Sequence, residues 1–312
     1  MLAMRSRRLG SRGPELSVIG YGAWEAGGAD WGPNESDAAV VASMRAAIDA
    51  GIDWIDTAEV YGKGVSETLV GKAIKGRRDE VLIATKVAPA DEGSGFAPDR
   101  IRAACDASLR RLDIEHIDLY QLHWPDPLGT PVEDTWGAMA ELQDAGKVRS
   151  IGVSNFDREL IVRCEPIRHV DSLQQEFSML ERDDRELIRW CGDQGTGVLS
   201  YSPLGAGLLT GAIGPGWRPP ADDWRAGQTS GPFADLDATL AFVELLRTQA
   251  DRFGIAIAQL ALAWNVAQPG VTAAIAGSRH PDHVRQNAAA ADVELDAATL
   301  AELEALLPVS GA

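Results

Sequence analysis

Cysteine is scarce in this sequence. The 312 residues include only Cys105, Cys164 and Cys191, which lie far apart in the chain. Three scattered cysteines are too few for a disulfide framework or a structural zinc site. We therefore expect no bound metal, and a reducing cytoplasm is the expected compartment.

Positive charge is also in short supply. Lys and Arg number 29 against 46 Asp and Glu, so the formal net charge is −17. A nucleic-acid-binding protein needs a basic face for the phosphates, so this balance argues against such a partner. An anionic ligand has to be held locally, by single Arg or Lys side chains or by backbone N–H groups.

Long apolar runs are missing as well. No segment has the length and apolar character of a membrane-spanning helix. The basic start, MLAMRSRRLGSRG, has no apolar stretch behind it, which argues against a secretory signal. We expect no contact with the membrane.

What the sequence does contain is a regular alternation of strand-like and helical segments. Helical spacing is clearest in residues 37–50, before Gly51, and in residues 132–145, before Gly146, where glycine permits the left-handed conformation that ends a helix. The eight strand-like runs are residues 16–22, 52–56, 81–86, 117–123, 148–155, 171–176, 197–203 and 271–277.

Eight such units without a Pro-, Ser- or charge-rich linker predict one closed (β/α)₈ barrel, a TIM barrel, as a single domain over residues 1–312. A doubly wound sheet is the alternative. Its usual G-x-G-x-x-G turn after the first strand is not matched by GYGAWEAGG. One long loop, residues 210–233, follows the seventh strand, and a loop of this length is usually functional or mobile.

Four polar side chains lie at or just after the ends of strand-like runs: Asp56, Tyr61, Lys86 and His123. A barrel brings the carboxyl ends of its strands together at the active-site face. A desolvated Lys86 needs a counter-charge, which Asp56 supplies, and a nearby Lys86 should lower the pKa of Tyr61. Structural explanations also exist: an ordinary ion pair, a surface aromatic and a packing histidine.

Such a group of residues is suited to protonating an oxygen atom while another group delivers electrons. His123 is placed to orient a carbonyl oxygen or to share the proton. Since no metal cluster is visible in the sequence, the expected electron donor is a reduced organic cofactor.

Several segments, in order and over essentially the whole chain, resemble the aldo-keto reductases. They are DTAEVYG, ATK, DLYQLHWPDP, GVSNF, SYSPLGAGLLTG and IAGSRHPDHVRQNAAA. The resemblance implies an NAD(P)H-dependent oxidoreductase that reduces aldehydes or ketones to alcohols. It makes Tyr61 the general acid, Asp56 and Lys86 the residues that tune it, and His123 the residue that steers the carbonyl oxygen.

The resemblance also assigns residues to the cofactor, NADPH in preference to NADH. Each assignment has a structural alternative. Ser154 and Asn155 alternatively cap a helix ahead of Asp157, and Gln174 is alternatively an ordinary polar residue of a strand. Tyr201 is alternatively a core residue, and the residues after it alternatively form a plain turn. The residues assigned to the cofactor are Ala23, Trp24, Ser154, Asn155, Gln174, Tyr201, Ser202, Leu204, Gly205, Gly207, Gly277, Ser278, Arg279, His283, Gln286 and Asn287.

At the adenosine end the chain departs from better-known family members. Many of these have a Lys where this chain has Gly277 and an Arg where it has His283. Arg279 is then the candidate for the 2′-phosphate of NADPH, since a guanidinium binds phosphate in a planar, bidentate way. A solvated arginine at a helix start is the alternative explanation for Arg279.

The substrate side is defined by aromatic residues. The resemblance places Trp24 and Trp124 in a wall for a small-molecule carbonyl substrate, although either residue is alternatively part of the core. Trp217, Trp224 and Phe233 belong to the long loop, and we expect them to close over the substrate.

Two other functions remain open at this point. The resemblance includes potassium-channel β subunits, which suggests a cofactor-binding regulatory module. An unrelated barrel enzyme, such as an isomerase that binds phosphate or a hydrolase, is the other. The resemblance suggests a monomer or a weak dimer.

Overall fold

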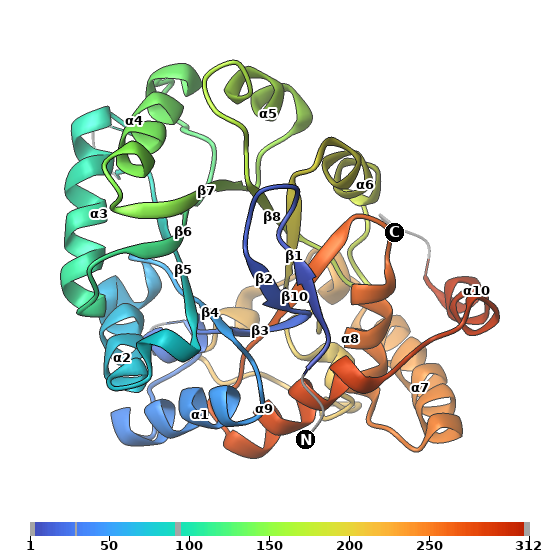
Figure 1. Cartoon of the computed structure of the whole chain (residues 1–312). Coiled ribbons are helices and arrows are strands. Elements are labelled where there is room, and N and C mark those ends of the chain that lie inside the picture. Colours follow the sequence, from blue (N-terminus) through green and yellow to red (C-terminus); the bar gives the residue numbers. More distant parts are fainter. Residues whose placement is uncertain (1–3, 29, 91–94, 309–312) are drawn as a thin grey trace.

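The computed structural model describes residues 4–28, 30–90 and 95–308, so both ends of the predicted domain lie outside the described residues. Eight parallel strands close into a barrel in the order β10-β3-β4-β5-β6-β7-β8-β9 (Figure 1). This confirms the predicted (β/α)₈ fold. The barrel strands are β3 (Ile19–Gly22), β4 (Trp54–Asp56), β5 (Leu82–Val87), β6 (Ile117–Leu122), β7 (Val148–Ser154), β8 (Ser172–Glu176), β9 (Gly197–Tyr201) and β10 (Val271–Ala276).

The first strand-like run divides into two elements. Residues 16–22 contain the end of β2 (Glu15–Ser17), which pairs antiparallel with β1 (Ser6–Arg8), and then the barrel strand β3. Figure 1 shows this hairpin in front of the barrel opening. Its Leu9 and Leu16 pack with the inward-facing Trp54, so the hairpin covers the apolar interior. β1 was not predicted from the sequence, because three residues are too few to show alternation.

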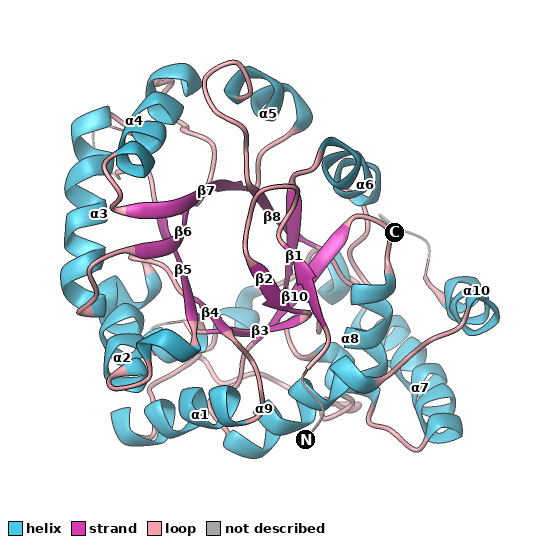
Figure 2. Cartoon of the chain, viewed as in Figure 1, coloured by secondary structure: helices cyan, strands magenta, loops and turns pink. Residues whose placement is uncertain are grey.

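Helices surround the barrel (Figure 2). Both predicted helices form, and Gly51 and Gly146 follow them with positive φ angles of 91° and 72°. Among the described helices none has the length and apolar character needed to cross a membrane. The helices are α1 (Asp37–Asp49), α2 (Val65–Ile74), α3 (Pro98–Leu112), α4 (Val132–Asp144), α5 (Arg158–Cys164), α6 (Arg185–Gln194), α7 (Leu236–Phe253), α8 (Ile257–Ala267), α9 (Pro281–Ala289) and α10 (Ala297–Leu306).

The long loop after β9 packs against the segment between β3 and α1. The backbone N–H of Trp224 donates to the carbonyl of Asp30 at 2.8 Å, and Trp31 forms a β-bridge with Asp223. The Trp224 ring lies 5.6 Å from the Trp24 ring. Two loops at the carboxyl ends of the strands are therefore joined to each other.

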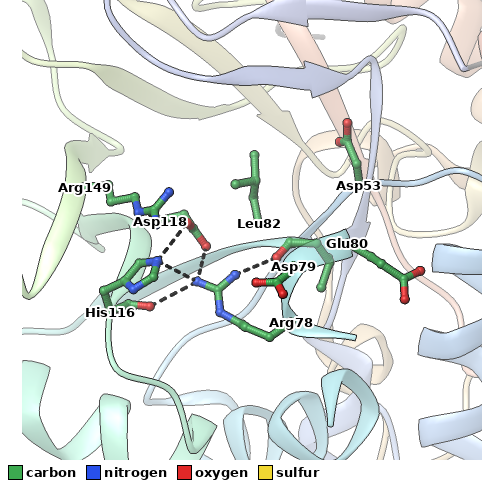
Figure 3. Close-up of a pocket in the computed structure, with 9 residues that line it drawn as sticks. Asp53, Arg78, Asp79, Glu80, Leu82, His116, Asp118 and Arg149 are labelled. Atoms are coloured by element: carbon green, nitrogen blue, oxygen red, sulfur yellow. Dashed lines mark hydrogen bonds and ion pairs between the residues drawn. The ribbon is translucent and has the colours of Figure 1, made fainter. Parts of the chain in front are cut away.

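The opposite end of the barrel carries a network of charged side chains around Asp118 (Figure 3). Asp118 is only 3% exposed and accepts hydrogen bonds from Arg78 Nη2 at 2.6 Å and from the Ile83 N–H at 2.8 Å. His116 Nε2 and Arg149 Nε lie 3.7 and 3.8 Å from its other oxygen. Arg78, His116, Asp118 and Arg149 line a cavity of about 360 Å³. The network joins the amino ends of β5, β6 and β7, so it serves stability.

We predict that Asp118→Asn lowers the free energy of unfolding by about 2 kcal/mol, because it leaves the Arg78 charge without its buried partner. Urea unfolding measures the change. Asp79→Asn is the matched control, since Asp79 lines the same cavity but is exposed. The control should stay within about 0.5 kcal/mol of the wild type. Equal losses in the two variants would contradict the assigned role of Asp118.

Candidate active site

Lys86 is the centre of the polar group at the carboxyl ends of the strands. Its side chain lies in β5 and is completely buried. Its ammonium donates to Asp56 Oδ2 at 2.6 Å, to the Thr57 carbonyl at 2.9 Å and to Tyr61 Oη at 3.2 Å. An ammonium has three N–H donors and no acceptor, so these contacts use all of its hydrogen-bonding capacity.

Burial and the ion pair act in opposite directions on Asp56 and Lys86. Burial raises the pKa of Asp56, while the Lys86 ammonium and the Gln174 amide oppose that rise. Burial lowers the pKa of Lys86, but Asp56 and Tyr61 outweigh it, and the pKa of Lys86 is raised. Lys86 is therefore protonated at neutral pH.

The expectation that the pKa of Tyr61 falls below its ordinary value is wrong. Burial raises the pKa of the phenol above its ordinary value, and the nearby Lys86 charge only partly opposes that rise. Asp56 adds to it, because its negative charge disfavours a second anion nearby. Tyr61 therefore keeps its proton throughout the neutral pH range.

His123 follows β6 directly and faces Tyr61, with the two ring centroids 5.7 Å apart. Burial, with a smaller contribution from Lys86, lowers the pKa of His123 to about 2. The imidazole is therefore neutral. Its Nδ1 is buried and has no hydrogen-bond partner among the described residues. The ring stacks on Trp124 at 3.7 Å.

A cavity of about 970 Å³ opens above this group. It brings together residues from strands and loops that are far apart in the sequence. Of the residues predicted for the site, Ala23, Lys86 and Gly205 lie outside its lining. Those that line it are Trp24, Asp56, Tyr61, His123, Trp124, Ser154, Asn155, Gln174, Tyr201, Ser202, Leu204, Gly207, Gly277, Ser278, Arg279, His283, Gln286 and Asn287.

Ser154, Asn155, Gln174 and Tyr201 form one connected wall. Gln174 Nε2 donates to Asp56 Oδ1 at 2.8 Å, and the Tyr201 hydroxyl donates to Asn155 Oδ1 at 2.8 Å. Asn155 Nδ2 donates to Ser154 Oγ at 3.1 Å. The cap of α5 is Asp157 instead, so Ser154 and Asn155 are not helix caps.

The segment that follows Tyr201 is a tight turn that lines the same cavity. Ser202, Gly205, Ala206 and Gly207 all have positive φ angles. Positive φ is uncommon for residues other than glycine, and such strain is concentrated at functional sites. A Cβ at Gly207 would lie 3.2 Å from Arg225 Nη1, so a larger residue would crowd this wall. The plain-turn explanation accounts for the shape but not for the strain at Ser202 and Ala206.

Arg279 lines the cavity and is not simply solvated. Its guanidinium donates to the carbonyls of Trp31, Gly32 and Pro33 at 3.0 to 3.1 Å. These partners are neutral, and the nearest carboxylate oxygen, from Glu25, is 3.9 Å away. Arg279 therefore fastens the segment before α1 and still supplies positive charge to the cavity.

Gly277 has a packing reason to be glycine. A Cβ at this position would lie 2.3 Å from the Gly22 carbonyl oxygen of the neighbouring strand. The backbones of β3 and the end of β10 thus approach closely. Ser278 Oγ lies 3.4 Å from His283 Nδ1, and both side chains line the cavity.

Several lining residues were not predicted from the sequence, because they belong to loops and single short turns that have no periodic pattern. Arg225 is the clearest: it forms an ion pair with Asp223 at 2.6 Å, donates to the Ala206 carbonyl at 3.0 Å and stacks on Trp31. Its only sequence signal was a charged pair within the long loop. Glu25, Asp30, Trp31, Val60, Pro203, Thr210, Ala212, Pro220 and His280 are others that line the cavity.

Only some of the aromatic residues that we expected to contact the substrate line the cavity. Trp24 and Trp124 line the cavity, and Trp124 is 42% exposed at its mouth. Trp217, Trp224 and Phe233 lie outside the lining, although the Trp224 ring contacts that of Trp24. The closure of these three side chains over a substrate remains a prediction.

Comparison with known proteins gives a consistent result. The family model described as the aldo/keto reductase family matches residues 18–308. Aldo-keto reductase YhdN of Bacillus subtilis (strain 168) is 38% identical over 286 residues, which are 89% of this chain and 86% of that protein.

Two solved structures extend the comparison. Glycerol dehydrogenase AKR11B4 from Gluconobacter oxydans is 30% identical with a TM-score of 0.87, covering 100% of this chain and 99% of its own. An aldo-keto reductase from Klebsiella pneumoniae, solved with NADPH, is 32% identical with a TM-score of 0.78, covering 100% of this chain and 98% of its own.

We predict that Lys86→Met lowers the free energy of unfolding by about 3 to 5 kcal/mol, because it leaves a buried Asp56 carboxylate unpaired. Urea unfolding of the two single variants, Lys86→Met and Asp56→Asn, and of the double variant tests this. The double variant should recover about half of the loss, since asparagine carries no charge and still accepts from Gln174. Strictly additive losses from the two single changes would contradict the coupling.

Proposed function

The chain belongs to the aldo/keto reductase family, and we propose that it reduces aldehydes or ketones to alcohols, with NADPH as reductant and Tyr61 as proton donor. One observation carries the proposal: the Lys86 ammonium donates a hydrogen bond to the Tyr61 hydroxyl oxygen. Because Lys86 has no acceptor, the phenol oxygen has to accept in this contact. The phenol proton is then available for another acceptor.

The position of Tyr61 indicates where its hydroxyl proton can go. Tyr61 lines the cavity, while Lys86 lies beneath it and outside the lining. A carbonyl oxygen in the cavity is an acceptor that the phenol can meet. As the oxygen gains negative charge during reduction, the hydrogen bond strengthens and the proton moves to it.

His123 supplies a second donor. A buried N–H without a partner costs more than a buried lone pair without one, so we assign the proton of the neutral ring to Nε2. The orphaned Nδ1 then needs no acceptor. Nε2–H donates to the same carbonyl oxygen and orients it toward Tyr61. Stacking on Trp124 keeps the ring in this position.

NADPH fits the remaining residues of the cavity. Its nicotinamide would be held by Ser154, Asn155, Gln174 and Tyr201, and its phosphates by the turn of residues 202–207, where small residues admit backbone N–H groups. Ser278, Arg279, Gln286 and Asn287 would hold the adenosine end. The chemistry that NADPH supplies when bound is transfer of a hydride to the carbonyl carbon. The relative from Klebsiella pneumoniae that was solved with NADPH supports this assignment, and NADH is the alternative.

The raised pKa of Tyr61 favours reduction over its reverse. Reduction requires the protonated phenol, which is present below the pKa, whereas oxidation of an alcohol requires the phenolate, which appears only above it. The reverse reaction is therefore expected at high pH with excess oxidised cofactor. The relative from Gluconobacter oxydans is named for oxidation of an alcohol, glycerol, which is consistent with such a reverse reaction.

We predict that Tyr61→Phe lowers kcat for aldehyde reduction by about 10² to 10⁴, because it removes the proton donor and keeps the ring. Steady-state oxidation of NADPH with a panel of aldehydes measures the loss. Fluorescence titration with NADPH is the control and should give nearly the wild-type Kd. Activity retained in the variant would exclude Tyr61 as the acid.

We predict that Arg279→Ala weakens NADPH binding more than NADH binding, by about 1.5 kcal/mol, because only NADPH carries the 2′-phosphate that meets the guanidinium charge. Titration of both cofactors measures the difference, and Arg279→Lys is the control that keeps the charge. Equal weakening of both cofactors would show that Arg279 acts only by fastening residues 31–33.

A further inference from the structure

Four carboxylates line the cavity, and three of them lie close to a cation. Asp56 pairs with Lys86 at 2.6 Å, Asp223 pairs with Arg225 at 2.6 Å, and Glu25 lies 3.9 Å from Arg279. The fourth is Asp30, which is exposed and lines the cavity without an ion pair to any residue that the structure describes. It therefore presents an uncompensated negative charge.

Hydrogen bonds hold Asp30 at the catalytic end of the cavity. Trp24 Nε1 donates to Asp30 Oδ2 at 3.0 Å, and the Trp24 ring centroid lies 6.3 Å from that of Tyr61. On the other side, the backbone carbonyl of Asp30 accepts from the Trp224 N–H at 2.8 Å. The carboxylate thus belongs to the aromatic wall next to the proposed proton donor, and its second oxygen has no partner among the described residues.

The cationic side chains at the cavity do not cancel this charge for a substrate. Lys86 and Arg225 are paired with Asp56 and Asp223, and the charge of Arg279, whose carbonyl partners are neutral, is assigned to the phosphate of the bound cofactor. The whole chain also carries a net charge of −17. An approaching anion therefore meets repulsion, whereas a hydroxyl group meets an acceptor.

We propose that Asp30 sets the substrate class of this site: neutral carbonyl compounds with a hydroxyl group away from the carbonyl, which donates to Asp30, in preference to compounds that carry a carboxylate. The inference rests on the proposed reductase function. Asp30 acts through charge and hydrogen bonding to the part of the substrate that does not react.

Three para-substituted benzaldehydes of similar size test this: 4-methyl-, 4-(hydroxymethyl)- and 4-carboxybenzaldehyde. In the wild type, kcat/KM should be highest for the hydroxymethyl compound and lowest for the carboxylate. Added salt should raise kcat/KM for the carboxylate, because screening weakens the repulsion.

Asp30→Asn is the informative variant, because its amide oxygen still accepts from Trp24 while the charge is gone. It should raise kcat/KM for 4-carboxybenzaldehyde about fivefold, lower it for the hydroxymethyl compound about threefold and change it least for the methyl compound. The dependence of kcat/KM on salt for the carboxylate should also weaken. An unchanged melting temperature shows that the variant is folded.

Asp222→Asn is the matched control, because Asp222 lies next to the same loop, near Gly32, but outside the cavity lining. Asp222→Asn should leave kcat/KM for all three aldehydes as in the wild type. Unchanged kcat/KM values in Asp30→Asn, or the same changes of kcat/KM in Asp222→Asn, would overturn the role of Asp30 while leaving the reductase function intact. A wild type that reduces none of the three aldehydes with NADPH or NADH would overturn the proposed function and this inference with it.

Discussion

The buried ammonium of Lys86 is the constraint on which the active end of the barrel depends. A charge in a fully buried position is tolerated only if its donors are satisfied and a counter-ion is near. Asp56, Thr57 and Tyr61 meet both requirements. The same contacts fix the Tyr61 oxygen as an acceptor, so stability and proposed chemistry depend on one group.

Charged side chains have different roles at the two ends of the barrel. At the amino ends, Asp118 gathers Arg78, His116 and Arg149 into a network that joins neighbouring strands. At the carboxyl ends, Lys86 lies beneath a large cavity, and other charged residues such as Arg225 line that cavity and bind to loops. This division agrees with the general behaviour of the fold, in which one end serves stability and the other serves function.

The few positive charges near the cavity of this acidic chain also have structural roles. Arg225 and Arg279 each bind backbone carbonyls of loops around the cavity, so they shape it as well as charge it. Asp30 is left without such a partner next to the aromatic wall. Local pairing, and not the net charge, therefore distinguishes the proposed cofactor end from the proposed substrate end.

The sequence by itself determined the eight-strand order and the places of Asp56, Tyr61, Lys86 and His123, because alternation of apolar runs and polar strand ends is a local pattern. It did not determine the hairpin strand β1, the pKa of Tyr61, the partners of Arg279 or the position of Asp30. Tertiary structure decided these, since desolvation and hydrogen bonding depend on atoms that segments far apart in the chain bring together. Arg279 and Trp31, separated by most of the sequence, are in contact only because the barrel closes between β10 and β3.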